Sequence, residues 1–193
     1  MRSYIMLQGI LNYAHELLKE CVHPNETVID ATCGNGNDTV FLSKLVGEHG
    51  LVLGFDIQEQ AINNTKQKLK ENNCDNVKLI LDSHANADTY LSTDTEQSIA
   101  GAIFNLGYLP KSDKSIITQG HTTMTAINKI LQRLKENGII VLVIYHGHPG
   151  GKEEKDIILD KVSKLDQKKY TVLKHEFLNQ ANTPPFLVAI QKR

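Results

Sequence analysis

The chain has 193 residues, of which 40% are hydrophobic and 22% charged, as expected for one soluble α/β domain rather than a fibrous or disordered protein. Its net charge of −1 excludes a global basic field for a polyanion, although a local basic patch is enough to bind nucleic acid. No run is apolar enough to span a membrane, and the amphipathic N-terminus does not resemble a signal peptide. Three widely spaced cysteines, Cys21, Cys33 and Cys74, predict reduced thiols in a cytoplasmic protein.

Strand and helix patterns alternate along the chain. The first half predicts helices over 10–21, from near 38 to 47, over 58–72 and, more weakly, over 84–92, with strands over 27–31, 51–55 and 77–81. The second half predicts a strand over 99–104, a helix over 115–136, a very apolar strand over 138–145, a charged helix over 151–165 and two strands over 170–176 and 186–191.

This order predicts an α/β fold with a mostly parallel sheet and helices on both faces. The link between the last two strands is too short for a crossover helix, so these strands should form an antiparallel hairpin. We expect one domain over 1–193, with 1–25 as an N-terminal helical extension.

The turn after the first strand reads DATCGNGNDT, and its two glycines, Gly34 and Gly36, let the main chain turn tightly and approach a ligand. It lacks the third glycine of a dinucleotide fingerprint and does not match a P-loop. An NAD-dependent oxidoreductase is therefore disfavoured. Cys33 lies in this turn, where a small packing residue is a simpler interpretation than a nucleophile.

An acid follows each of the first three predicted strands: Asp30, Asp56 and Asp82. Because parallel strands end at one edge of a sheet, the three carboxylates should meet there. Asp56 lies twenty residues past Gly36, where an acid accepts hydrogen bonds from a ribose diol. Three acids suit a cationic ligand without phosphate, and S-adenosylmethionine has that chemistry. A strand-end cap or a solvated loop residue is the alternative interpretation of each acid alone.

The segments DATCGNGND, FDIQ and LDSH resemble the cofactor motifs of Rossmann-like class I methyltransferases, whose seven-stranded sheet has the order 3-2-1-4-5-7-6 and ends in an antiparallel hairpin. This resemblance implies S-adenosylmethionine as cofactor and a binding set of Asp30, Gly34, Asn35, Gly36, Asn37, Asp38, Asp56, Gln58, Asp82, Ser83 and His84.

Together with FNLGYLPKSDK and YHGHPGGKEE, these segments resemble a small family formerly labelled as rRNA methylases and now associated with tRNA 5-aminomethyl-2-thiouridine methylation. The resemblance extends over essentially the whole chain. It implies methyl transfer to the primary amine of the wobble uridine, with the tRNA anticodon stem-loop as partner.

Asn105-Leu-Gly-Tyr108 stands where amine-directed methyltransferases carry an Asn/Asp-Pro-Pro-aromatic loop, but Leu106-Gly107 replaces the two prolines. The Asn105 side chain and the Leu106 carbonyl are candidate acceptors for the amine hydrogens, and Tyr108 is a candidate stacking residue. His146 is a candidate proton acceptor. The expected catalytic residues are Asn105, Tyr108 and His146, and the expected substrate-binding residues are Leu106, Gly107, Pro110, Lys111, His148 and Lys152. The alternative interpretations are structural. Asn105 would be a turn former, Tyr108 an amphipathic residue of the cleft wall, and His146 and His148 polar loop residues.

Lysines in the loops and helix starts after the fourth and fifth predicted strands are candidate phosphate contacts: Lys111, Lys114, Lys152 and Lys155. The histidine spacings match no standard metal site, so no metal is expected. Three alternatives stay open: methylation of another RNA position, methylation of a small amine, and a non-catalytic S-adenosylmethionine-binding module. The sequence does not fix the oligomeric state, and a homodimer is one arrangement that stays open.

Overall fold

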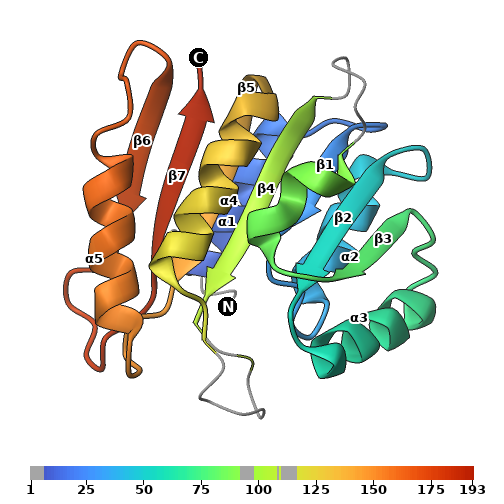
Figure 1. Cartoon of the computed structure of the whole chain (residues 1–193), viewed down its shortest axis with the longest axis horizontal. Coiled ribbons are helices and arrows are strands. Elements are labelled where there is room, and N and C mark those ends of the chain that lie inside the picture. Colours follow the sequence, from blue (N-terminus) through green and yellow to red (C-terminus); the bar gives the residue numbers. More distant parts are fainter. Residues whose placement is uncertain (1–6, 92–97, 108, 110–116) are drawn as a thin grey trace, which may run out of the picture.

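The computed structural model describes residues 7–91, 98–107, 109 and 117–193 (Figure 1). In chain order the first elements are α1 (Ile10–Cys21), β1 (Thr27–Asp30), α2 (Asn37–Val46), β2 (Leu51–Asp56), α3 (Glu59–Glu71), β3 (Val77–Leu81) and the 3-10 helix η1 (His84–Tyr90). They are followed by β4 (Ile99–Leu106), α4 (Gly120–Arg133), β5 (Leu134–Ile144), α5 (Gly151–Val162), β6 (Tyr170–His175) and β7 (Phe186–Lys192). None of the helices in these ranges combines the length and apolarity needed to cross a membrane.

The seven strands form one sheet in the order β3-β2-β1-β4-β5-β7-β6, so the predicted order is confirmed. β1 to β5 pair in parallel, whereas β7 runs antiparallel to both β5 and β6. The predicted C-terminal hairpin is therefore also confirmed. Because the chain order reverses between β1 and β4, the carboxyl ends of these two strands open a crevice at the sheet edge.

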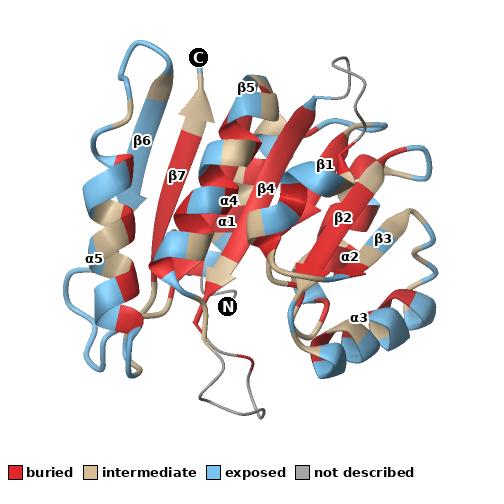
Figure 2. Cartoon of the chain, in the orientation of Figure 1, coloured by how far each residue is buried: buried red, intermediate tan, exposed pale blue. Residues whose placement is uncertain are grey.

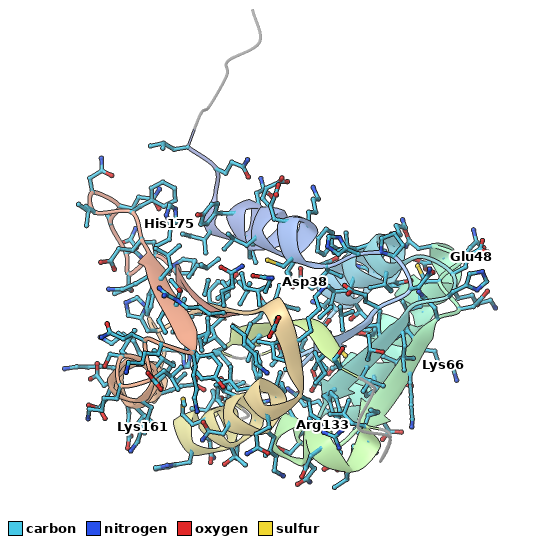
Figure 3. The ribbon with its side chains drawn as sticks, turned by 90° about the horizontal axis from the view of Figure 1, so that it is seen from above. Asp38, Glu48, Lys66, Arg133, Lys161 and His175 are labelled. Atoms are coloured by element: carbon cyan, nitrogen blue, oxygen red, sulfur yellow. The ribbon has the colours of Figure 1, made fainter. Side chains whose placement is uncertain are left out.

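Each face of the sheet carries its own apolar core. Ile10, Ala14 and Leu18 recur at four-residue spacing on α1 and pack with α2 residues on one face. Residues of η1, α4 and α5 pack on the other face. Figure 3 shows this layering from above, and Figure 2 shows that β4 and β7 are largely buried while the edge strand β6 is exposed.

Several element boundaries differ from the sequence-based expectation. β4 continues two residues past Phe104, because Asn105 and Leu106 pair with Val143 and Ile144 of β5. The helix predicted over 115–136 is wrong at both ends. Among the described residues α4 begins only at Gly120, after the extended Gln119, and it stops at Arg133, where the next residue already pairs with β4. Residues 110–116 lie outside the described residues. The first difference matters for the site, because it places Asn105 on a rigid strand rather than in a loop.

Candidate active site

A cleft of about 1180 Å³ lies at the carboxyl ends of the parallel strands, where the chain order reverses between β1 and β4. It brings together predicted residues from five separate stretches of the chain. Those that line it are Gly34, Asn35, Asn37, Asp38, Asp56, Gln58, Asp82, Ser83, His84, Asn105, Gly107, His146 and His148.

Some predicted site residues do not line the cleft. Asp30 and Leu106 are fully buried, and Gly36 lies behind the turn. Lys152 is exposed on α5. The predicted residues Tyr108, Pro110 and Lys111, with Lys114, fall outside the described residues.

The glycine turn has the backbone conformation that its sequence predicts. Gly34 and Gly36 have φ angles of +52° and +76°, in the left-handed region that favours glycine. A Cβ on Gly36 would lie 3.0 Å from the Cα of Thr65 on α3, so this glycine also allows close packing. The Thr65 hydroxyl in turn donates to the Gly34 carbonyl at 3.2 Å. The turn is therefore held from behind by α3 while its other side faces the cleft.

Asp56 links this turn to the end of β2. Its Oδ2 accepts the Gly34 N–H at 3.0 Å, and its Oδ1 accepts the Gln58 N–H at 3.0 Å. Burial raises the pKa of Asp56, and these backbone hydrogen bonds oppose that shift. A carboxylate has about four lone-pair sites, so both oxygens can still accept hydrogen bonds from a ligand.

Asp30 has a structural place beneath the turn. Its carboxylate accepts the Thr39 hydroxyl at 2.6 Å and the Thr32 N–H at 3.2 Å. Complete burial, with a further contribution from the charge of Asp38, raises its pKa to about 7. Asp30 thus ties β1 to the start of α2 instead of presenting a carboxylate to the cleft.

The third acid, Asp82, directly follows β3. The Asp82 carboxylate accepts the Ser83 N–H at 2.7 Å and the Tyr90 hydroxyl at 2.8 Å, and the Asn86 amide also donates to it. These hydrogen bonds, that of Tyr90 first, lower the pKa of Asp82. The hydroxyl oxygen of Ser83 accepts the Ala85 N–H and so caps η1. Asp82 is therefore ionised and oriented by the residues that follow it.

His84 closes this wall of the cleft. Its Nδ1 lies 3.0 Å from the Ala31 carbonyl, which can only accept, so Nδ1 carries the proton. Burial lowers the pKa of His84, which favours the neutral ring. Within the described residues its buried Nε2 has no hydrogen-bond partner. Nε2 is consequently an unsatisfied acceptor at the cleft wall.

Cys33 also lines the cleft, but it is only 4% exposed and packs against Gly54. Burial, reinforced by the charges of Asp30 and Asp56, raises the pKa of its thiol well above the usual value. The thiolate is the nucleophilic form of cysteine, so this environment disfavours a nucleophile. The packing interpretation of Cys33 fits the structure better.

Asn105 projects from β4 at the other side of the cleft. Its backbone N–H donates to the Thr32 hydroxyl at 2.7 Å. Its side-chain Nδ2 donates to Asp38 Oδ2 at 2.6 Å, and His15 Nε2 on α1 lies 2.6 Å from Asp38 Oδ1. Asp38, predicted to bind cofactor, therefore bridges two other elements at the edge of the cleft.

The residues after Asn105 are fastened by a second polar network. The Leu106 carbonyl accepts the Tyr145 N–H at 2.9 Å, so it is already engaged by β5 and is a poorer candidate acceptor than the sequence suggested. The Gly107 N–H donates to the Thr118 hydroxyl, which donates to Glu154 at 2.6 Å. Burial raises the pKa of Glu154, which is 3% exposed. This network connects the end of β4 to α5.

His146 and His148 follow β5 and both line the cleft, as the sequence predicts. The His146 ring lies edge-on to Phe186, and its buried Nδ1 has no hydrogen-bond partner in the part of the chain that the structure describes. His148 Nδ1 lies 3.0 Å from the Pro149 carbonyl and so donates to it. An added Cβ on Gly107 would lie 3.6 Å from His148 Nε2, so this imidazole nitrogen lies beside Gly107.

Sequence analysis did not identify His15, Thr118 and Glu154. His15 belongs to a helix whose pattern indicates only core packing, and it is 23 residues from its partner. Thr118 and Glu154 are 36 residues apart. No local motif joins these residues, so only their contacts in the fold reveal them.

Known proteins resemble this chain over most of its length. The sequence model of the family described as "Putative rRNA methylase" matches residues 52–191. A chloroplastic tRNA (mnm(5)s(2)U34)-methyltransferase from Arabidopsis thaliana is 38% identical over 191 residues, which cover 93% of this chain and 68% of that protein.

Two solved structures are similar over almost their whole length. The structure described as a "putative rRNA-methylase" from Clostridium thermocellum has a TM-score of 0.93 and 47% identity, and the match covers 97% of this chain and 99% of that one. A "putative methyltransferase" from Streptococcus mutans, solved in complex with SAH, has a TM-score of 0.88 and 46% identity over 97% of this chain and 100% of that one. The chain therefore belongs to the "Putative rRNA methylase" family and is an S-adenosylmethionine-dependent methyltransferase.

Proposed function

We propose that this protein methylates tRNA, transferring a methyl group to the primary amine of 5-aminomethyl-2-thiouridine at the wobble position. The name of the Arabidopsis relative specifies a modification of this kind at U34, and its similarity extends over 93% of this chain. The structural observation that carries the proposal is the Asn105 side chain, which lines the cleft at the end of β4 with its Nδ2 bound to Asp38. Its carbonyl oxygen is thereby left to accept a hydrogen from an amine.

The residues on the β1-β2-β3 side fit S-adenosylmethionine. Asp56 has remaining acceptor capacity for a ribose diol, and the glycine turn lets main chain approach a ligand without a Cβ in the way. The unsatisfied Nε2 of His84 suits a donor such as the exocyclic amine of adenine. We assign Asp30 and Gly36 to holding the turn, and Asp56, Asp82, Ser83 and His84 to contacts with the bound molecule. S-adenosylmethionine supplies an electrophilic methyl group.

The chain's own task is to bring a neutral amine into line with that methyl group. The amine lone pair forms the new N–C bond while the C–S bond breaks. The electron pair of the C–S bond stays on sulfur. The product ammonium then releases one proton, for which His146 is the candidate acceptor because its Nδ1 is unpartnered among the described residues. Most of the acceleration is expected from orientation, since an in-line displacement depends strongly on alignment.

We further propose that the anticodon stem-loop enters beside β4 and β5, with His148 and the predicted Tyr108, Pro110, Lys111 and Lys152 near the base and phosphates. Lys155, also predicted there, pairs with Asp156 at 3.2 Å. The three cysteines carry no disulfide, in keeping with a reducing compartment such as the cytoplasm. We regard 1–193 as one methyltransferase domain, in which α1 completes the cleft.

The test is nucleoside mass analysis of tRNA from a strain lacking the gene. We expect 5-aminomethyl-2-thiouridine to accumulate and its methylated form to disappear. Purified protein should then transfer labelled methyl from S-adenosylmethionine to that tRNA. Already modified tRNA from the wild-type strain, rRNA and small amines serve as parallel acceptors. Methylation of rRNA, which the family description favours, or of small amines instead of tRNA would refute the proposal.

A further inference from the structure

Three polar side chains from three separate elements form a continuous hydrogen-bonded series at the cleft. His15 comes from α1, Asp38 from the first turn of α2 and Asn105 from β4. His15 Nε2 lies 2.6 Å from Asp38 Oδ1, and Asn105 Nδ2 lies 2.6 Å from Asp38 Oδ2. All three residues line the cleft. Figure 3 shows Asp38 beneath α1, near the middle of the molecule.

The His15 end of this hydrogen-bonded series is fixed by packing. The His15 ring stacks on Phe41, with ring centroids 3.8 Å apart and planes 5° apart. Helix α1 itself is anchored by Ile10, Ala14 and Leu18, which are buried against the sheet. The imidazole therefore holds one carboxylate oxygen of Asp38 from a rigid position.

The inner end determines the orientation of the Asn105 amide. Asp38 uses one oxygen for His15 and the other for Asn105, so the carboxylate plane is set by both partners. The Asp38 oxygen accepts this hydrogen bond, so Asn105 presents its NH2 group to Asp38. A flipped amide would place two acceptor oxygens against each other. The Asn105 carbonyl oxygen consequently points away from Asp38.

An acid in the first turn of a helix also stabilises the helix dipole, and this ordinary role fits Asp38. It does not account for the two hydrogen bonds that Asp38 makes to side chains 23 and 67 residues away. Nor does core packing account for them, because Asp38 keeps 13% and His15 26% of its side chain exposed at the cleft.

We infer that His15, acting through Asp38, is a positioning residue that sets the Asn105 amide with its carbonyl oxygen toward the methyl acceptor. This inference rests on the proposed role of Asn105 in amine methylation. It assigns to the N-terminal helix a direct part in turnover, although the helix contributes none of the predicted cofactor contacts. Neither His15 nor Asp38 needs to touch the acceptor for this effect.

A double-mutant cycle tests the inference. We expect His15→Ala to lower kcat about tenfold and Asn105→Ala to lower it about 100-fold, with the affinity for S-adenosylmethionine changed less than twofold. Because His15 acts through Asn105, the double variant should be no slower than Asn105→Ala alone. His15→Gln, whose amide can still donate to Asp38, should recover most of the activity. Independent, multiplicative losses in the double variant would overturn the inference.

The matched control is His49→Ala, which removes an exposed histidine in the loop between α2 and β2. Figure 3 labels its neighbour Glu48 at the edge of the molecule, away from the central Asp38. Activity of this variant should equal that of the unaltered protein. An equal loss in both histidine variants would indicate a general effect of histidine removal and contradict the positioning role.

A second measurement does not depend on the methyl acceptor. The side-chain amide resonances of Asn105, identified by their absence in Asn105→Ala, should shift and exchange faster in both His15→Ala and Asp38→Ala. Unchanged amide resonances would overturn the inference even if tRNA is methylated. Failure to methylate any tRNA would refute the proposed function alone, because the amide measurement would still report how Asn105 is held.

Discussion

The two sides of the cleft are held together in different ways. On the cofactor side, at the ends of β1, β2 and β3, acids bind backbone N–H groups of nearby turns, as Asp56 does with Gly34 and Gln58. On the acceptor side, at the ends of β4 and β5, the partners of Asn105 and Gly107 are side chains from elements that are distant in the sequence. Asn105 depends on Asp38 and His15, and Gly107 depends on Thr118 and Glu154.

This difference explains why one side is easier to recognise than the other. A backbone donor is present at every non-proline residue, so an acid after a strand and a glycine turn are enough to specify the first arrangement. A side-chain relay needs particular residues on elements that meet only in the folded protein. We therefore expect substitutions on the cofactor side to change binding, and those on the acceptor side to change turnover.

The largest effect should come from Asn105→Ala. Loss of the amide removes an acceptor that acts on the amine, so kcat for tRNA should fall about 100-fold or more. Calorimetric affinity for S-adenosylmethionine should stay within twofold of the unaltered protein. Asn63→Ala, at an exposed position on α3, is the control and should leave both quantities unchanged. Equal losses of affinity and turnover in Asn105→Ala would erase the distinction between the two sides.

Asp56→Ala should give the complementary result. It removes a carboxylate that accepts the Gly34 N–H and has lone pairs left for a diol, so the Kd for S-adenosylmethionine should rise about 30-fold, or roughly 2 kcal/mol. Isothermal titration calorimetry measures this change. The control is Glu59→Ala, an exposed acid at the start of α3. An unaltered Kd for Asp56→Ala would remove Asp56 from the cofactor site.

Two glycine variants at the ends of α2 combine backbone strain and packing differently. Gly36 (φ +76°, ψ 13°) lies in the left-handed helical region, and an added Cβ would lie 3.0 Å from the Cα of Thr65. Gly47 (φ +69°, ψ 179°) lies in a region that only glycine adopts readily, but an added Cβ there would meet open space. We expect each alanine variant to cost about 2 kcal/mol in the free energy of unfolding, at Gly36 from strain and contact together and at Gly47 from strain alone. Urea denaturation gives both values. A cost well below about 1 kcal/mol for Gly36→Ala would mean that the turn relaxes and Thr65 moves aside freely.

The smallest effect concerns the buried acid beneath the turn. The pKa of Asp30 is about 7 in the folded protein, above its ordinary value of 3.8. Between these two values the unfolded chain has lost this proton while the folded chain keeps it, so the contribution of Asp30 to stability falls as pH rises and levels off above pH 7. We expect this contribution to be on the order of 1 kcal/mol larger at pH 5.5 than at pH 8.

The free energy of unfolding of the unaltered protein and of Asp30→Asn, measured at both pH values, isolates this contribution. The control is Asp75→Asn, which replaces an exposed acid. Its free energy of unfolding should differ from that of the unaltered protein by the same amount at both pH values. A difference that grows toward pH 8 would show that Asp30 is ionised and well satisfied in the folded state.

Much of the fold could be predicted because its pattern is local. The spacing of Ile10, Ala14 and Leu18 specifies α1, and the short link after β6 specifies the antiparallel hairpin. The boundary between α4 and β5 could not be predicted, because the pairing of Leu134 with Ile99 overrides a polar stretch that is compatible with helix. The same pairing of strands places Asn105 within β4, where the sequence indicates only a turn.

The sequence by itself determined the alternation of strands and helices, the C-terminal hairpin, the glycine turn and the acids at the strand ends, because each follows from residue types at short spacing. The sheet order was implied by the resemblance to class I methyltransferases. Tertiary structure alone decided that Asp30 lies buried behind the turn, that the Leu106 carbonyl is engaged by β5, and that Asp38 joins His15 to Asn105. These outcomes depend on which side chains meet after α1, α2 and β4 pack together, and hydrogen-bond partners far apart along the chain leave no periodic signal in it.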